Sequence, residues 1–128
     1  MMNEQSEETL RRVFLADYER IESMMSRVLE TAARQASDEV LAVWLELEAA
    51  IVARLDAEER VILPLLLGRL ERDSRALVHE NKHIRRRLAE ARRACESANL
   101  SKVGAVLEEL RAHALHEHAV IEKLRSGR

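Results

Sequence analysis

The sequence predicts an all-α protein in which four helices form an antiparallel bundle and run up-down-up-down. Glycine and proline are scarce, at 3 and 1 of 128 residues, whereas the helix-favouring residues Leu, Ala, Glu and Arg are abundant. Four segments repeat apolar residues at spacings of three and four, as helices with one buried face do. The short polar connections between these segments favour antiparallel neighbours.

The first predicted helix begins near Ser6, a suitable N-cap that acidic residues follow. Its apolar stripe is Leu10, Phe14, Tyr18, Ile21, Met25, Val28 and Ala32. The second begins near Ser37 or Asp38, and Pro64 is expected to kink or end it, because proline lacks a backbone donor. Its stripe is Val40, Trp44, Leu47, Ile51, Arg54, Glu58, Ile62 and Leu65, in which Arg54 and Glu58 replace apolar residues.

The third predicted helix begins near Asp73 and ends near Asn99. Its stripe is Leu77, Asn81, Ile84, Leu88, Ala91 and Cys95, with Asn81 as the polar exception. The fourth is expected to be capped by Ser101, and Gly127 follows its end. Its stripe is Val103, Val106, Leu110, His113, Glu117, Val120 and Leu124, so His113 and Glu117 are also expected to face inward.

The two halves of the chain form an internal repeat. Asp17, Tyr18, Ile21 and Met25 correspond to Glu80, Asn81, Ile84 and Leu88 at an offset of 63, and Ile51, Arg54 and Glu58 correspond to Leu110, His113 and Glu117 at an offset of 59. Repeated helix pairs with polar residues at one depth are how di-metal carboxylate sites are built. We therefore predict a polar network in the core, made of Tyr18, Arg54, Glu58, Asn81, His113 and Glu117.

The stretch RLDAEERVILPLL resembles a segment of the hemerythrin-like (HHE cation-binding) domain family, in which His-x-x-x-Glu-Glu precedes an apolar pair and a proline. The family's histidine is Arg54 here, and Tyr18, Asn81 and Leu77 stand where the resemblance implies further ligands. The resemblance therefore implies a hemerythrin-like fold with a degenerate di-iron site. It leaves Glu58, His113 and Glu117 as candidate metal ligands.

A different register of the third helix would add His79 and His83 to the metal ligands, because their spacing suits two ligands on one helical face. At about 100° per residue, however, they lie away from the apolar stripe and share a face with charged residues. We expect both histidines at the surface.

Two hypotheses account for the polar core. In the first, Arg54 compensates the charge of Glu58 and Glu117, while Tyr18, Asn81 and His113 complete the hydrogen bonds. No cofactor is then expected, and the protein is a non-catalytic structural, regulatory or partner-binding bundle. In the alternative, His113, Glu58 and Glu117 bind non-heme iron in a reduced or mononuclear site. The protein would then be an iron or metal sensor, or a carrier of oxygen or nitric oxide.

Composition limits the other classes of function. One domain is expected over residues 1–128, and a net charge of −2 from interspersed acidic and basic residues does not favour nucleic acid. The longest uncharged apolar run, residues 61–67, is too short for a membrane span. A single cysteine and no export signal predict a cytoplasmic protein. No nucleophile–base pair indicates an enzyme, and the expected partners are an unidentified protein or a second copy.

Overall fold

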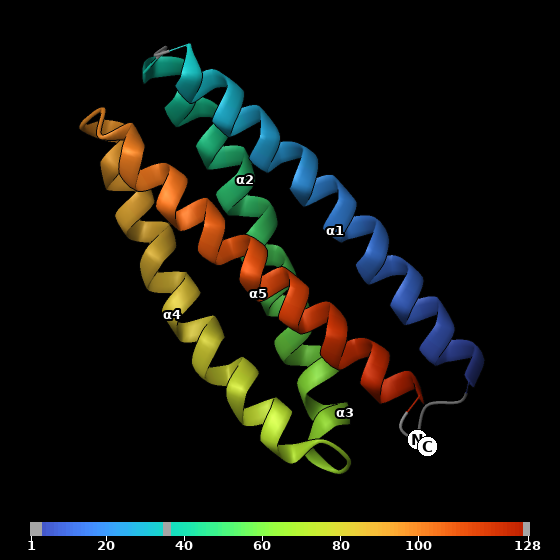
Figure 1. Ribbon diagram of the computed structural model, residues 1–128. Helices are drawn as coiled ribbons and strands as arrows, with labels where there is room; N and C mark the ends of the chain where they lie inside the picture. Colours follow the sequence, from blue (N-terminus) through green and yellow to red (C-terminus); the bar gives the residue numbers. More distant parts are fainter. Residues whose placement is uncertain (1–3, 35–36, 127–128) are drawn as a thin grey trace.

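The computed structural model describes residues 4–34 and 37–126, and this part of the chain is all-helical, as predicted. Its four long helices are α1 (Glu4–Ala33), α2 (Ser37–Ala57), α4 (Glu71–Glu96) and α5 (Leu100–Ser126). α1 packs against α2 and α5, and α4 packs against the same two helices. The arrangement is compatible with a four-helix bundle (Figure 1). No helix in the described ranges has both the length and the apolar character that crossing a membrane requires.

The helix starts differ slightly from the predicted ones. α2 begins at Ser37, as expected, and α1 and α4 each begin two residues before the predicted Ser6 and Asp73. α5 begins at Leu100, so Ser101 lies inside the helix and is not its N-cap; its hydroxyl donates to the side-chain oxygen of Asn99 at 3.1 Å. The side chains of Ser6 and Leu10, and all of Gly127, lie outside the described residues.

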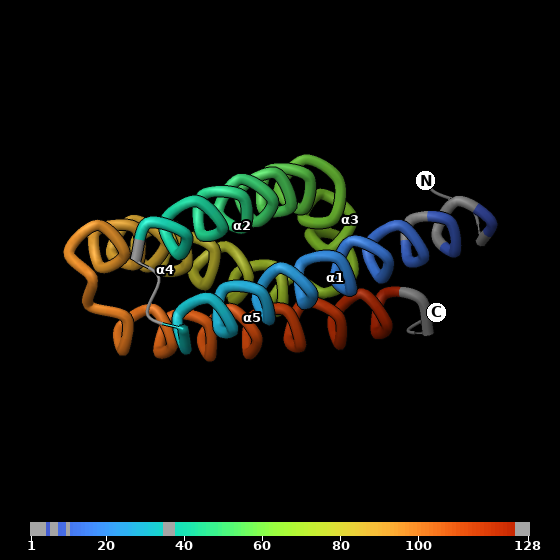
Figure 2. Tube along the Cα trace, turned by 90° about the horizontal axis from the view of Figure 1, so that it is seen from above, coloured from blue at the N-terminus to red at the C-terminus, as the bar shows by residue number. Residues whose placement is uncertain are grey.

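The helical turn just before Pro64 is wider than an α-helical turn, and a short helix continues after it. A π-helical turn, η1 (Glu58–Ile62), follows α2 directly, and the short helix α3 (Leu63–Leu67) begins after it. The N–H of Leu63 donates to the carbonyl of Glu58, five residues earlier. Because proline lacks an N–H and clashes with the preceding turn, a wider turn accommodates it. α3 then turns away from the line of α2 (Figure 2).

The end of α4 contains a left-handed residue. Ala98 has a φ of 59°, a conformation that usually requires glycine. The N–H of Asn99 donates to the carbonyl of Ala94 at 2.8 Å, and the N–H of Ala98 donates to that of Cys95 at 3.3 Å. These bonds close the helix in the pattern of a Schellman motif.

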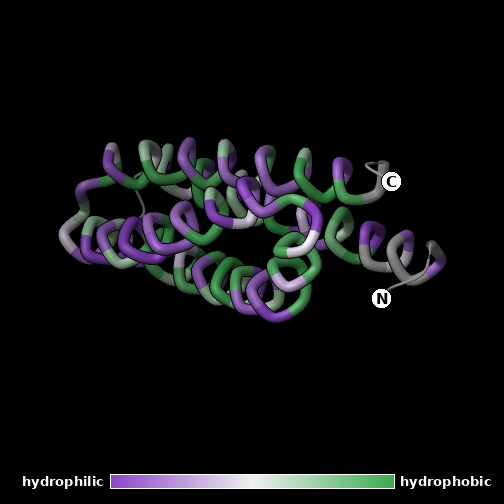
Figure 3. The backbone as a smooth tube through the Cα atoms, turned by 90° about the horizontal axis from the view of Figure 1, so that it is seen from below, coloured by the Kyte–Doolittle hydropathy of each residue, from purple (hydrophilic) through white to green (hydrophobic). Residues whose placement is uncertain are grey.

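The core has two apolar clusters with a polar layer between them. The larger cluster surrounds the fully buried Trp44, and the smaller one contains Leu77 and Val120. The polar layer consists of five buried residues, Arg54, Glu58, Asn81, His113 and Glu117. On α4, for example, Asn81 lies between Leu77 of the smaller cluster and Ile84 of the larger one. Hydrophobic and hydrophilic residues alternate along each helix, as the burial of one stripe requires (Figure 3).

Candidate metal centre

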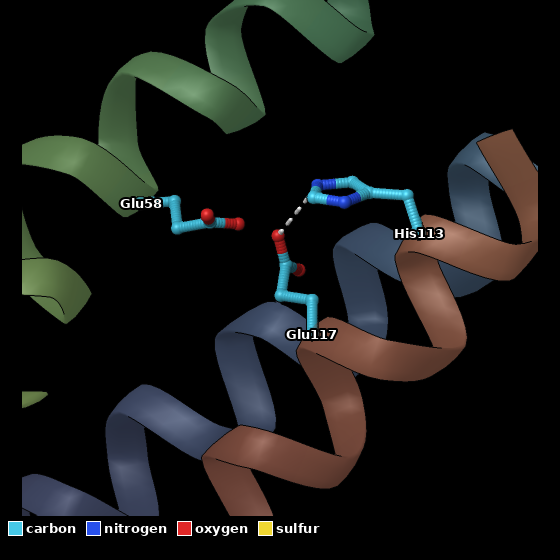
Figure 4. Close-up of side chains that lie close together, drawn as sticks. All are labelled: Glu58, His113 and Glu117. Carbon is cyan, nitrogen blue, oxygen red and sulfur yellow. Dashed lines mark ion pairs between the residues drawn. The ribbon is translucent and has the colours of Figure 1, made fainter. Parts of the chain in front are cut away.

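Three potential metal ligands converge in the polar layer. Glu58 comes from η1, whereas His113 and Glu117 are four residues apart on α5 and therefore share one face of the helix. One ligand atom from each lies within 4.8 Å of the others, and Figure 4 shows the three side chains meeting. Glu58 and Glu117 are 0% exposed and His113 is 9% exposed. The three residues predicted as ligands are thus brought together inside the core.

The imidazole of His113 is held in an orientation that suits a ligand. Its Nδ1 lies 2.8 Å from Oε1 of Glu80, and His116 pairs with the other oxygen of Glu80 at 2.6 Å. Burial lowers the pKa of His113, although the hydrogen bond to Glu80 opposes this. At neutral pH the ring is therefore neutral, with its proton on Nδ1 facing Glu80. The lone pair of Nε2 is directed inward, as in carboxylate–histidine–metal arrangements.

Arg54 binds one carboxylate of the layer and not the other. Its Nε donates to Oε1 of Glu117 at 2.7 Å, and Nη2 contacts the same carboxylate. Its Nη1 donates to the carbonyl of Phe14 and to Asp17, both at 2.9 Å. The guanidinium also lies 5.0 Å from the centre of the Phe14 ring, a distance that suits a cation–π contact. Burial raises the pKa of Glu117, which Arg54 offsets only in part.

The predicted partners of Arg54 were partly wrong. Arg54 was expected to compensate Glu58 and Glu117, and it binds Glu117 but not Glu58; its other partners are Asp17 and the carbonyl of Phe14. Of the side chains expected to complete the hydrogen bonds, Asn81 donates to Glu58. The guanidinium is directed toward α5 and α1, because its fork of donors reaches two carboxylates and a backbone carbonyl there.

Glu58 receives its hydrogen bond from the third long helix of the bundle. Nδ2 of Asn81, on α4, donates to Oε1 of Glu58 at 2.9 Å and to Oε2 of Glu59 at 3.2 Å. A neutral amide is therefore the donor to the carboxylate of Glu58, which is fully buried. A buried anion without a countercharge is costly, so Glu58 requires further compensation.

Unpartnered acceptor atoms are concentrated in the polar layer. Among the described residues, five buried side-chain atoms lack a hydrogen-bond partner, and four belong to this layer: Glu58 Oε2, Asn81 Oδ1, His113 Nε2 and Glu117 Oε2. Buried polar atoms are normally paired. Nε2 of His113 lies 4.0 Å from Oε2 of Glu117, which is too long for a hydrogen bond. All four atoms present lone pairs, so a metal cation, a proton or a water molecule could satisfy them.

The remaining predicted residues lie around this centre. Tyr18 is half-buried and, with Arg54, His113 and Glu117, lines a cavity of about 30 Å³; its ring is 6.5 Å from that of His118. His79 and His83 are exposed, and His83 pairs with Glu109 at 2.7 Å. The register that would make these two histidines ligands is therefore not the one adopted.

Sequence reasoning did not assign roles to three acidic residues that support the centre, namely Asp17, Glu59 and Glu80. The repeat contained a signal for two of them, because Asp17 and Glu80 are equivalent at the offset of 63. Each carboxylate contacts the polar residue of the following helix in its own half, Arg54 for Asp17 and His113 for Glu80.

The residues present fit one cation better than two. Leu77 lies in the smaller apolar cluster, and the guanidinium of Arg54 occupies the side of Glu117 where a second cation would be repelled. Glu58, His113 and Glu117 each bring one ligand atom within 4.8 Å of the others, and Oδ1 of Asn81 is a further unpartnered oxygen of the layer. Comparison of the chain with protein-family models, curated proteins and solved structures found no match.

Proposed function

We propose that this protein is a hemerythrin-like up-down-up-down helical bundle that binds a single metal cation through Glu58, His113 and Glu117. Its role is that of a metal-dependent sensor or carrier and not of an enzyme. The observation that carries the proposal is the set of four buried acceptors, on four residues, that no donor among the described residues satisfies. In a metal-free core each would cost free energy of about 1–3 kcal/mol.

The charges of the centre support a bound cation. Glu58 and Glu117 are buried carboxylates, and Asp17 adds a third beside them, whereas Arg54 contributes the one buried positive charge. His113 is neutral because burial lowers its pKa. Asp17 also pairs with Arg20 at 2.7 Å, so one negative charge, that of Glu58, is left without a cationic partner when all three carboxylates are ionised. A bound cation would compensate it within the layer.

Some residues of such a site would bind the cation, and others would orient its ligands. Glu58, His113 and Glu117 would hold the cation, while Glu80 fixes the tautomer of His113 and Arg54 fixes one oxygen of Glu117. With three protein ligands, a bound iron ion would keep coordination positions open for a small molecule. The cavity beside Tyr18, His113 and Glu117 provides room for no more than a ligand of about the size of water.

A second candidate function is that of a metal-free bundle with a structural, regulatory or partner-binding role. One specific observation favours it: Arg54 already neutralises Glu117 without any metal. A proton on Glu58 or Glu117 would then remove the remaining charge, and the raised pKa of Glu117, caused by burial, is in keeping with that state.

Metal content separates the two candidates. Purified protein would be analysed for metal, then incubated anaerobically with Fe²⁺ or Co²⁺, desalted and analysed again by mass spectrometry and visible absorption. We expect one ion per chain, lost in Glu58→Gln and in His113→Ala. His79→Ala, which removes an exposed histidine, is the matched control and should bind as the wild type does. A folded wild type that takes up no ion would exclude the metal-binding proposal and favour the metal-free bundle.

A further inference from the structure

Asn81 differs from the three candidate ligands because its side chain is an amide, whose nitrogen is hydrogen-bonded and whose oxygen is not. Nδ2 donates to two carboxylates, Glu58 at 2.9 Å and Glu59 at 3.2 Å. Oδ1 of the same amide is buried and has no donor among the described residues, and the side chain is 1% exposed. An amide turned the other way would place its oxygen against two carboxylates, so electrostatics fix the observed orientation.

Glu59 strengthens this orientation from the protein surface. Its Oε1 accepts a hydrogen bond from Nη2 of Arg85 at 3.0 Å, while its Oε2 accepts one from Asn81. Arg85 also binds Asp56 at 3.0 Å. The guanidinium holds the carboxylate of Glu59 in place, and Glu59 in turn holds the Nδ2 end of the amide. Through these contacts, a surface ion pair determines which atom of Asn81 remains free in the core.

We propose that Oδ1 of Asn81 is a fourth ligand to the cation, with Glu59 as the residue that positions it. This inference rests on the proposed function, because it concerns the same centre. Asn81 belongs to α4, so the ligand set then includes α4 as well as η1 and α5. A neutral amide oxygen adds a ligand without adding negative charge to the layer.

The resulting set of three oxygens and one imidazole nitrogen defines a chemical class of ligand. Carboxylate and amide oxygens suit hard cations such as Mn²⁺, and a single imidazole also suits Fe²⁺ and Co²⁺. No thiolate is near, because the one cysteine, Cys95, lies in the larger apolar cluster. The centre therefore takes a divalent first-row ion, and a soft monovalent ion such as Cu⁺ is not expected to bind.

The test uses Co²⁺ as the probe, since its visible absorption reports coordination number as well as occupancy. Wild-type protein, Asn81→Leu, Asn81→Asp and Glu59→Gln would be titrated, with Lys82→Ala as the control on the exposed face of α4. We expect Asn81→Leu to weaken binding at least about tenfold and to change the absorption band, and Glu59→Gln to weaken it about tenfold. Asn81→Asp, which keeps an oxygen at this reach, should bind more tightly than Asn81→Leu. Lys82→Ala should leave both properties unchanged.

The outcomes separate this inference from the proposed function. A wild type that binds one Co²⁺, together with an Asn81→Leu variant of unchanged affinity and band, would overturn the role of Asn81 and leave the metal site standing. A wild type that binds none would overturn both. If circular dichroism shows that Asn81→Leu does not fold, Asn81→Asp decides: an altered band supports ligation, and an affinity and band equal to those of the wild type contradict it.

Discussion

Arg54 and His113 occupy equivalent positions in the two halves of the chain, 59 residues apart. Each pairs with an acidic residue of the preceding long helix in its half: Arg54 with Asp17 at 2.9 Å, and His113 with Glu80 at 2.8 Å. They differ in the hydrogen-bonding groups that they present to the core. Arg54 presents donors, which Glu117 accepts, whereas Nε2 of His113 presents a lone pair that no donor meets. The two halves therefore compensate buried charge in different ways.

Replacing Arg54 with alanine should destabilise the protein strongly. The substitution leaves the buried carboxylate of Glu117 without a donor and removes a hydrogen bond to the carbonyl of Phe14, a change that costs about 3–5 kcal/mol. The free energy of unfolding would be measured by urea denaturation of the metal-free protein. Arg27→Ala breaks an exposed pair with Glu46 and, as the control, should cost less than about 1 kcal/mol. A loss of that smaller size for Arg54→Ala would show that its pairs contribute little.

Glu58→Gln should have opposite effects on the metal-free and metal-loaded proteins. Glu58 is fully buried, and its carboxylate accepts a hydrogen bond from the neutral amide of Asn81, so removing its charge should stabilise the metal-free bundle. The same substitution removes a ligand, and the increase in melting temperature on adding Co²⁺ should disappear. Both temperatures would be read by circular dichroism. A metal-free variant less stable than the wild type would show that the carboxylate is well compensated without a cation.

Cys95 should be unreactive in the folded protein. Burial, with smaller contributions from Glu48 and Glu96, raises the pKa of its thiol to about 11, and the thiolate is the reactive form. Labelling with a thiol reagent near neutral pH should be at least about 100-fold slower in buffer than in urea, as expected from a shift of two pKa units. Equal rates in the two conditions would mean that this part of the core opens readily.

Ala98→Gly should stabilise the protein. Ala98 adopts a φ of 59°, and a left-handed conformation costs a residue with a Cβ atom about 1 kcal/mol more than it costs glycine. Ala112→Gly, in the exposed interior of α5, should have the opposite sign, with a loss of about 1 kcal/mol. Thermal unfolding of the two variants beside the wild type tests both signs. A destabilising Ala98→Gly would be inconsistent with the left-handed conformation.

Glu109→Gln should reduce the loss of stability in acid. Partial burial acts to raise the pKa of Glu109, but hydrogen bonds and charges from His83 and Arg87 lower it below its ordinary value of 4.5 overall. The ionised carboxylate therefore contributes stability above that value, and the contribution is lost as the pH falls through the lowered pKa. Unfolding at neutral pH and at about pH 3 would be compared. As the control, Glu108→Gln, at a mostly exposed neighbour, should lose as much stability in acid as the wild type does. If Glu109→Gln also loses as much as the wild type, the contribution of the ionised Glu109 carboxylate is contradicted.

Much of the fold and the inward position of the polar residues followed from helical periodicity. Leu77, Asn81, Ile84 and Leu88 share one stripe of a helix, and all four are buried. The π turn could not be read in this way, because it arises where Pro64 meets a continuing helix and depends on the three-dimensional path around it. The left-handed Ala98 was similarly hidden, since alanine gives no local signal for that conformation.

The partners within the site were harder to predict than its members. A guanidinium carries several donors on a long stem, so periodicity places Arg54 in the core but does not select Glu117 and Asp17 over Glu58. Glu59 was missed for a related reason: it is exposed and outside the apolar stripe, and its contact with Asn81 depends on how η1 and α4 pack.

The division of the core into two clusters has a consequence for exchange with solvent. The smaller cluster joins α3 to the first part of α1 and the last part of α5, and these segments lie together at one end of the molecule (Figure 1). Because the polar layer separates it from the larger cluster, this end can open locally while the rest remains folded. Such an opening uncovers Glu58 and Glu117 without global unfolding. Local breathing, and not a permanent channel, would then set the rate at which a cation enters or leaves.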